Sequence, residues 1–305
     1  MSTVVKMMAK KEIEDLLKKV KHETGDLPPG MVARAKVQGH TLTVYRSNKV
    51  MIQGRDAENL AAGLLGVVPE KKSAPGTAAQ TTDYDLYSCI GSDEAGSGDY
   101  FGPMTVVASY VSKKNAEILK LLGVMDSKNL KDSKIVQLAE QIIPMIPHSL
   151  LVLDNPKYNE QKARGWSQVK MKAVLHNQAI MNVLRKIDKR PDYIVIDQFA
   201  VQGVYENYAL TPIPEREITR FETKGESKSI AIAASSIIAR YAFIKWMDQI
   251  EKETGLAIYK GAGAKVDLQA AKIIERKSLD YLDKVTKKDF KNRTKALTLI
   301  ERKRS

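Results

Sequence analysis

The segment GSDEAGSGDYFGP, residues 91–103, places two adjacent carboxylates directly after an apolar run. Asp93 and Glu94 follow Cys89 and Ile90, and two glycines that flank a serine come next. Neighbouring carboxylates repel each other, and burial beside a hydrophobic strand increases that penalty unless a cation offsets it. We therefore expect a positively charged partner at this point of the chain.

Two further acids stand at the ends of apolar segments. Asp197 ends the buried-strand pattern YIVID, and Glu226 precedes a long helical pattern for which Ser227 is the expected N-cap. Sites in α/β proteins collect at strand ends because loops converge there. One such acid is more often a turn former or a helix cap, but four together weaken that alternative. Oxygen ligands without histidine or cysteine partners favour Mg²⁺ or Mn²⁺ over zinc.

The spacing of the acid pair sets a condition on the backbone. In a regular strand Asp93 and Glu94 point to opposite faces, so both serve one site only if the strand ends or twists there, which Gly96 permits. His176, in a helical pattern, is interpreted as a packed or capping residue. A carboxylate cluster in a basic protein suits phosphodiester hydrolysis with two metal ions about 4 Å apart.

Composition indicates a soluble protein that attracts polyanions. The 305 residues carry a net charge of +13, which favours a nucleic-acid partner, with solubility alone as the alternative. The single Cys89 excludes an internal disulfide and fits a reducing cytoplasm. The N-terminus lacks the apolar core of a signal peptide, and the longest apolar stretch, from Ile230, ends at Arg240. We expect a cytoplasmic protein without a membrane span.

Residues 1–67 are expected to form a small α+β domain. A helical pattern over residues 8–23 precedes three short strands within 31–54, which predict an antiparallel meander, and AENLAAGLLG predicts a second helix. Residues 1–80 hold 13 Lys and Arg against 8 Asp and Glu. One sheet face is expected to offer basic and aromatic side chains to nucleic acid, with a merely solvated face as the alternative. These side chains are Arg34, Lys36, Tyr45 and Lys49.

Residues 68–83 are interpreted as a linker, and residues 84–305 as a larger α/β domain. The linker is rich in Pro, Ala, Thr and charge and has neither helical nor strand periodicity. In the larger domain a hairpin around the glycine-rich turn is followed by strands separated by helices, which predicts a mixed sheet with flanking helices. Asp267 is interpreted as a helix cap. Residues 284–305, with 9 Lys and Arg and 2 acids, predict a basic helix lying on the domain or on a substrate.

Four segments, in this order, resemble ribonuclease HIII, a bacterial type 2 ribonuclease H. They are DEAGSGDYFGP at 93–103, DSKNL at 126–130, VIDQF at 195–199 and KGESKSIAIAASSIIAR at 224–240. The resemblance spans most of the larger domain. It implies an RNase H-like catalytic domain, preceded by a TBP-like domain that binds the substrate.

The resemblance also implies an activity: endonucleolytic cutting of the RNA strand of RNA/DNA hybrids, leaving 5′-phosphate and 3′-hydroxyl ends. It assigns the two ions, Mg²⁺ or Mn²⁺, to four acids, which are Asp93, Glu94, Asp197 and Glu226. The amides of Gly96, Ser97 and Gly98 would face the 2′-hydroxyls that distinguish RNA from DNA.

Ser127 and Lys128 would contact backbone phosphate by the same resemblance, with a simple capped turn as the alternative. Two rival functions stay open. A cutter of single ribonucleotides in DNA, similar to ribonuclease HII, is disfavoured by Glu226 and by the absence of arginine from the turn. A non-catalytic hybrid-binding protein would leave the acids unexplained, because carboxylates facing phosphates weaken binding. We expect a monomer.

Overall fold

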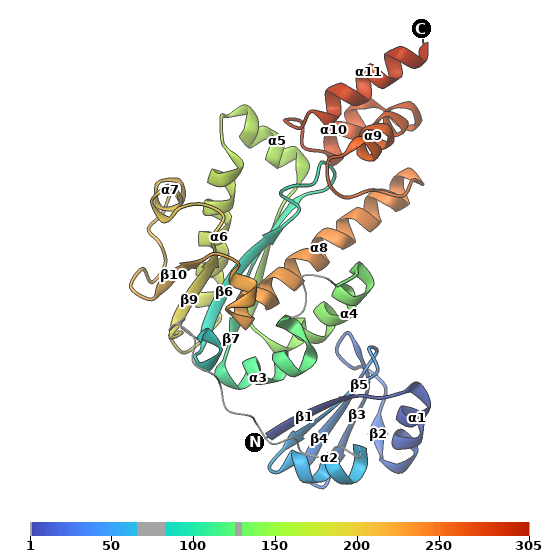
Figure 1. The fold of residues 1–305 in the computed structure, drawn as a ribbon, viewed down its shortest axis with the longest axis vertical. Coiled ribbons are helices and arrows are strands. Elements are labelled where there is room, and N and C mark those ends of the chain that lie inside the picture. Colours follow the sequence, from blue (N-terminus) through green and yellow to red (C-terminus); the bar gives the residue numbers. More distant parts are fainter. Residues whose placement is uncertain (1, 66–82, 126–129, 305) are drawn as a thin grey trace.

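The computed structural model describes residues 2–65, 83–125 and 130–304, which form two five-stranded sheets (Figure 1). Most of the expected linker, and also Ser127 and Lys128, lie outside the described residues. The first sheet lies before the expected linker and the second after it. Helices flank both sheets, as the sequence pattern predicts.

The N-terminal sheet has the strand order β1-β5-β4-β3-β2, and all its pairings are antiparallel. Its strands are β1 (Ser2–Met7), β2 (His22–Glu23), β3 (Met31–Val37), β4 (His40–Tyr45) and β5 (Lys49–Gly54). The predicted meander is β3 to β5. The two outer strands were not predicted, since β2 has two residues and β1 lacks a buried alternation.

Two helices, α1 (Lys10–Lys19) and α2 (Ala57–Leu65), cover one face of this sheet. Part of the other face packs on the second domain, where Tyr45 joins the same buried cluster as Leu122. Lys49 Nζ donates to the Leu122 carbonyl. The expectation that Tyr45 and Lys49 face nucleic acid is therefore wrong, because the interface between the two domains uses both. Arg34 and Lys36 of the same face are exposed.

The second sheet is mixed and has the order β10-β9-β6-β7-β8. Its strands are β6 (Cys89–Ala95), β7 (Met104–Val111), β8 (His148–Leu153), β9 (Tyr193–Asp197) and β10 (Thr219–Glu222). Strands β6, β7 and β8 pair antiparallel, whereas β9 runs parallel to both β6 and β10. This topology confirms the predicted mixed sheet and puts the carboxyl ends of β6 and β9 at the same edge.

Helices cover both faces of the second sheet (Figure 1). They are α3 (Lys113–Leu122), α4 (Asp132–Ile142), α5 (Asn155–Ala163), α6 (Gln168–Leu184), α7 (Gln202–Tyr208) and α8 (Ile230–Thr254). Helix α8 packs on β6 and β7, and α6 packs on the opposite face. A Cβ on Gly91 would lie 2.2 Å from the Ala231 carbonyl carbon, so glycine is what lets α8 approach β6 so closely.

Helix α8 is long and apolar enough, by length and composition, to cross a membrane. However, 72% of its apolar window is buried inside the protein, where it contacts β6 and β7. Burial of this kind is typical of the central helix of a globular core. The sequence predicts that this apolar stretch ends at Arg240, whereas the apolar part of α8 is longer than that.

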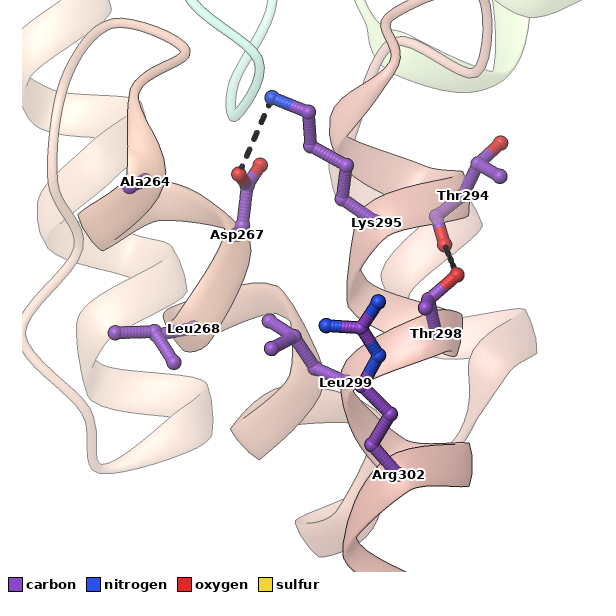
Figure 2. Close-up of a pocket in the computed structure, with 8 residues that line it drawn as sticks. All are labelled: Ala264, Asp267, Leu268, Thr294, Lys295, Thr298, Leu299 and Arg302. Carbon is purple, nitrogen blue, oxygen red and sulfur yellow. Dashed lines mark hydrogen bonds and ion pairs between the residues drawn. The ribbon is translucent and has the colours of Figure 1, made fainter.

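The chain ends in three packed helices, α9 (Ala264–Arg276), α10 (Leu279–Val285) and α11 (Asn292–Arg304). The predicted basic helix is α11, which begins later than expected and packs on α9. Asp267 is not a cap, because α9 already starts after Gly263. It is buried and accepts a hydrogen bond from Asn292 Nδ2. A pocket of about 500 Å³ opens between α9 and α11, and its lining contains none of the four candidate acids (Figure 2).

Candidate active site

Asp93 and Asp197 occupy equivalent positions on neighbouring parallel strands. Ser92 of β6 pairs with Ile196 of β9, so the next residue of each strand is an aspartate. Side chains at matching positions of adjacent strands lie on the same face, and here that face is covered by α8. Asp93 hydrogen bonds to Ser236 of α8. The sheet topology therefore brings together two acids that are about a hundred residues apart in the sequence.

Glu226 reaches the same edge through a 3₁₀ turn, Gly225–Ser227, that leads into α8. The Gly225 amide donates to Asp197 Oδ1 at 2.7 Å. A Cβ on Gly225 would lie 2.4 Å from Ile232 Cδ1 and 3.0 Å from Asp197 Oδ1, so a larger residue would displace both side chains. The residue at the N-cap of α8 is Ser229, and the predicted cap Ser227 lies inside the turn.

Glu94 points to the opposite face of the sheet. Strand β6 ends at Ala95, which pairs with Thr105, one residue after the acid pair, so Asp93 and Glu94 both lie within the regular strand and point to opposite faces. Glu94 Oε1 accepts a hydrogen bond from Lys172 Nζ at 2.6 Å, and its Oε2 lies 3.0 Å from His176 Nε2. Three acids thus approach the edge from the α8 face, and Glu94 approaches it from the α6 face.

The pKa values of the adjacent acids Asp93 and Glu94 are shifted in opposite directions. Burial, and then the charges of Glu94 and Asp197, raise the pKa of Asp93 well above its ordinary value. Burial acts in the same direction on Glu94, but the contacts with His176 and Lys172 outweigh it and lower the pKa to about 2. For Asp197, burial and the charge of Glu226 raise the pKa against the Gly225 hydrogen bond. The repulsion expected from the sequence is therefore concentrated on the two aspartates.

The donor set fits a hard divalent cation, since it consists of carboxylate oxygens at a buried edge where added positive charge would offset repulsion. In the arrangement observed, no three His, Cys, Asp or Glu side chains among the described residues are grouped so that they could hold a metal ion. Glu94 is engaged with Lys172 and His176 instead.

His176 and Lys172 are the contacts that the sequence interpretation missed. His176 is completely buried, and its Nδ1 lies 2.8 Å from Ser92 Oγ, so the imidazole connects two residues of β6. The sequence does show that Lys172 and His176 are four residues apart, a spacing that puts them on one face of a helix. Nothing in a helical pattern alone says that this face meets an acid.

The glycine-rich turn follows the acids directly. Gly96 has φ +83°, and a Cβ there would lie 2.3 Å from the Pro103 carbonyl oxygen, so the position requires glycine. Ser97 is half-buried and Gly98 is exposed. The turn is thus buried at Gly96 and reaches the surface at Ser97 and Gly98, next to the acids.

Comparison with known proteins gives concordant matches over the chain. The ribonuclease HII family profile matches residues 90–293, and a domain of unknown function, DUF3378, matches residues 3–75. A ribonuclease HIII of Macrococcus caseolyticus is 67% identical over 300 residues, covering 93% of this chain and 96% of that protein. A ribonuclease HIII of Staphylococcus saprophyticus is 58% identical and covers 99% of both.

A solved structure agrees with these matches. The crystal structure of Bst-RNase HIII in complex with Mn²⁺ superposes with a TM-score of 0.70 at 36% identity, covering 99% of this chain and 100% of that chain. The profile match covers more than half of the residues, and the relatives match almost end to end. The chain therefore belongs to the ribonuclease HIII family.

Proposed function

We propose that this protein is a metal-dependent endoribonuclease that cuts the RNA strand of RNA/DNA hybrids and leaves 5′-phosphate and 3′-hydroxyl ends. The observation that carries the proposal is the pair Asp93 and Asp197, side by side at the ends of parallel strands. The relatives named ribonuclease HIII and the Mn²⁺ complex of Bst-RNase HIII support it.

Divalent ions, Mg²⁺ or Mn²⁺ and two in number, would be held by Asp93, Glu94, Asp197 and Glu226. When bound, such ions supply an activated water and stabilise the leaving oxygen. The protein contributes a rigid, partly desolvated edge: Ser236 orients Asp93, and the Gly225 amide orients Asp197. Lys172 and His176 keep Glu94 ionised and directed. A pre-arranged donor set of this kind reduces the reorganisation needed during the reaction.

Substrate selection would come from surfaces beside the acids. The backbone amides of residues 96–98 would face 2′-hydroxyls of the RNA strand, a group that DNA lacks. Ser127 and Lys128 remain predicted phosphate contacts.

Arg34 and Lys36 of the N-terminal domain share a surface hollow of about 500 Å³ with Lys21 and His22. Its lining holds three cations, Lys21, Arg34 and Lys36, against one acid, Glu23, and such a positive excess suits a phosphate backbone, whose binding is dominated by these charges. We propose that this hollow binds the hybrid away from the acids, and that the protein acts as a monomer.

The direct test is cleavage of an RNA/DNA hybrid labelled on the RNA strand. A DNA duplex with one embedded ribonucleotide is assayed in parallel, each with Mg²⁺, Mn²⁺ or chelator. Multiple cuts in the RNA that chelator abolishes, with weak cutting of the single ribonucleotide, are expected. Preferred cutting at the lone ribonucleotide would instead indicate a ribonuclease HII-like specificity. Binding without any cutting would contradict the enzymatic proposal.

A further inference from the structure

The glycine-rich turn is held in place by groups that come from distant parts of the chain. The Ser97 carbonyl accepts a hydrogen bond from Gln168 Nε2 of α6 at 3.0 Å. Further along the same loop, the Tyr100 amide donates to the Gly261 carbonyl at 3.0 Å. The conformation of the loop between β6 and β7 therefore depends on tertiary contacts and not on its own hydrogen bonds alone.

Lys287, between α10 and α11, makes the most concentrated set of these contacts. Its side chain is completely buried, and Nζ donates to the Asp99 carbonyl at 2.8 Å and to the Gly102 carbonyl at 2.6 Å. Its backbone amide donates to the Tyr100 carbonyl at 3.0 Å. One residue thus binds three carbonyls of a single short loop.

A buried ammonium is unfavourable unless its donors are matched, and hydrogen bonds from a charged donor are about twice as strong as neutral ones. Burial lowers the pKa of Lys287 to about 8, with Asp99 and Asp289 opposing the shift. The side chain therefore remains largely protonated at neutral pH. The loop carbonyls and the two carboxylates thus offset only part of the desolvation penalty, and the ammonium still donates to two carbonyls of the loop.

A second path joins Lys287 to the start of the loop. Its ammonium lies 5.8 Å from the ring centroid of Tyr158, which is also completely buried. The Tyr158 hydroxyl accepts from Gln168 Nε2 at 2.9 Å, and the same nitrogen donates to the Ser97 carbonyl. Lys287 and its neighbours thus contact the loop at both ends, at Ser97 and at Gly102.

We infer that Lys287 is a positioning residue for ribose recognition: it fixes the loop so that the amides of residues 96–98 meet the 2′-hydroxyl of the RNA strand. This inference rests on the proposed function, which assigns those amides to the 2′-hydroxyl. A small displacement of a recognition loop weakens a hydrogen bond that depends on direction and distance. Lys287 itself does not touch the reacting atoms.

The test measures the penalty for removing single 2′-hydroxyls. Hybrids carrying one 2′-deoxynucleotide at successive positions flanking a fixed cut are compared with the all-RNA strand, and kcat/KM is determined for wild type, Lys287→Met and Lys288→Met. Lys288 is the matched control, because it is the adjacent lysine and its side chain is half exposed and paired with Asp283. Loss of one hydrogen bond should reduce wild-type cleavage by roughly 3- to 10-fold at the recognised position.

In Lys287→Met this deoxy penalty is expected to fall toward one, while Lys288→Met keeps the wild-type penalty. A merely structural role would lower the active fraction for all substrates equally and leave the penalty unchanged, which would overturn the inference. A wild-type enzyme that cuts hybrids without a deoxy penalty at any position would overturn it as well. Failure of the wild type to cut hybrids at all would instead contradict the proposed function.

Lys287→Gln, which keeps a donor on a shorter side chain, is the second variant should the methionine variant fail to fold. Its melting temperature is measured beside the kinetics, so that only folded protein is compared. An intermediate deoxy penalty supports positioning by Lys287, and a penalty equal to that of wild type contradicts it.

Discussion

Asp93 and Glu94 are consecutive residues whose side chains contact helices on opposite faces of one sheet. Asp93 hydrogen bonds to Ser236 of α8, whereas Glu94 is held by Lys172 of α6 at 2.6 Å. The two carboxylates therefore differ in their electrostatic partners: Glu94 is paired with the cation Lys172 and contacts His176, and Asp93 faces the acids. A bound cation would act most strongly on Asp93.

Replacing Asp93 with asparagine should abolish cleavage and spare binding. The substitution keeps the size of the side chain but removes the charge that a metal ion requires, so hybrid cleavage should fall by several orders of magnitude. Hybrid affinity, measured by fluorescence anisotropy, should stay within a few-fold. Asp188→Asn is the control, because Asp188 is an exposed residue beyond the end of α6. Full activity in Asp93→Asn would remove the metal-site assignment.

The same substitution should stabilise the metal-free protein at neutral pH. A carboxyl whose pKa is raised by folding, as that of Asp93 is, destabilises the folded state at pH values above its unfolded pKa of about 3.9, and the penalty disappears as the pH falls to that value. In chelator at pH 7, Asp93→Asn should melt higher by roughly 2–4 °C, the shift that about 1 kcal/mol produces.

The difference between the two melting temperatures should shrink toward pH 4, and added Mn²⁺ should raise the melting temperature of the wild type more than that of the variant. Thermal melts across this pH range measure both effects. A variant that is less stable than wild type at pH 7 would show that Asp93 is not under electrostatic strain.

Removing the imidazole of His176 should weaken metal binding. His176→Ala frees Glu94 Oε2 and Ser92 Oγ, both of which contact the ring in a buried setting. Loss of groups that orient a metal ligand typically reduces metal affinity or activity by about 10- to 100-fold. The Mn²⁺ concentration needed for half-maximal cleavage, and the Mn²⁺ dissociation constant measured by calorimetry, should both rise.

His148→Ala provides the comparison, since the Nδ1 of His148 contacts only the nearby Ile146 carbonyl among the interactions seen in the described chain. It should leave the Mn²⁺ requirement unchanged. Equal effects of the two histidine substitutions would point to general destabilisation and would contradict orientation of Glu94 by His176.

Neutralising Arg34 and Lys36 together should raise KM and leave kcat nearly unchanged, because the acids lie in the other domain. The slope of log affinity against log salt concentration should also become less steep by about two, because the substituted side chains no longer neutralise about two phosphates. Lys10→Ala/Lys11→Ala, an equal change of charge at exposed positions of α1, is the matched control. A fall in kcat at unchanged KM would argue against a binding role for this hollow.

Removing the whole N-terminal domain, residues 1–80, should likewise raise mainly KM. It has a second consequence, however, because Tyr45 and Lys49 are part of the contact with α3. Deletion exposes apolar surface of the second domain, so the melting temperature should fall as well. The double substitution separates these effects, since Arg34 and Lys36 are exposed, whereas Tyr45 is buried in the contact.

Local patterns in the sequence determined much of the architecture. Alternation and apolar runs predicted β3, β4 and β5 and also β6, β7 and β9, because each of these strands has at least one buried face. The short strands β2 and β10 have too few residues to show a period. The sequence also predicted that the four acids lie at the ends of elements, because turns and strand ends have their own residue preferences. These acids are Asp93, Glu94, Asp197 and Glu226.

The tertiary structure alone decided which side chains meet. The pairing of Ser92 with Ile196 sets Asp93 beside Asp197, and a shift of one residue would have placed them on opposite faces. The contact of Glu94 with His176 depends on the rotation of α6 over β6, and the contact of Lys287 with the loop carbonyls joins segments about 190 residues apart. Such contacts arise from packing between elements, and no local period of the chain encodes them.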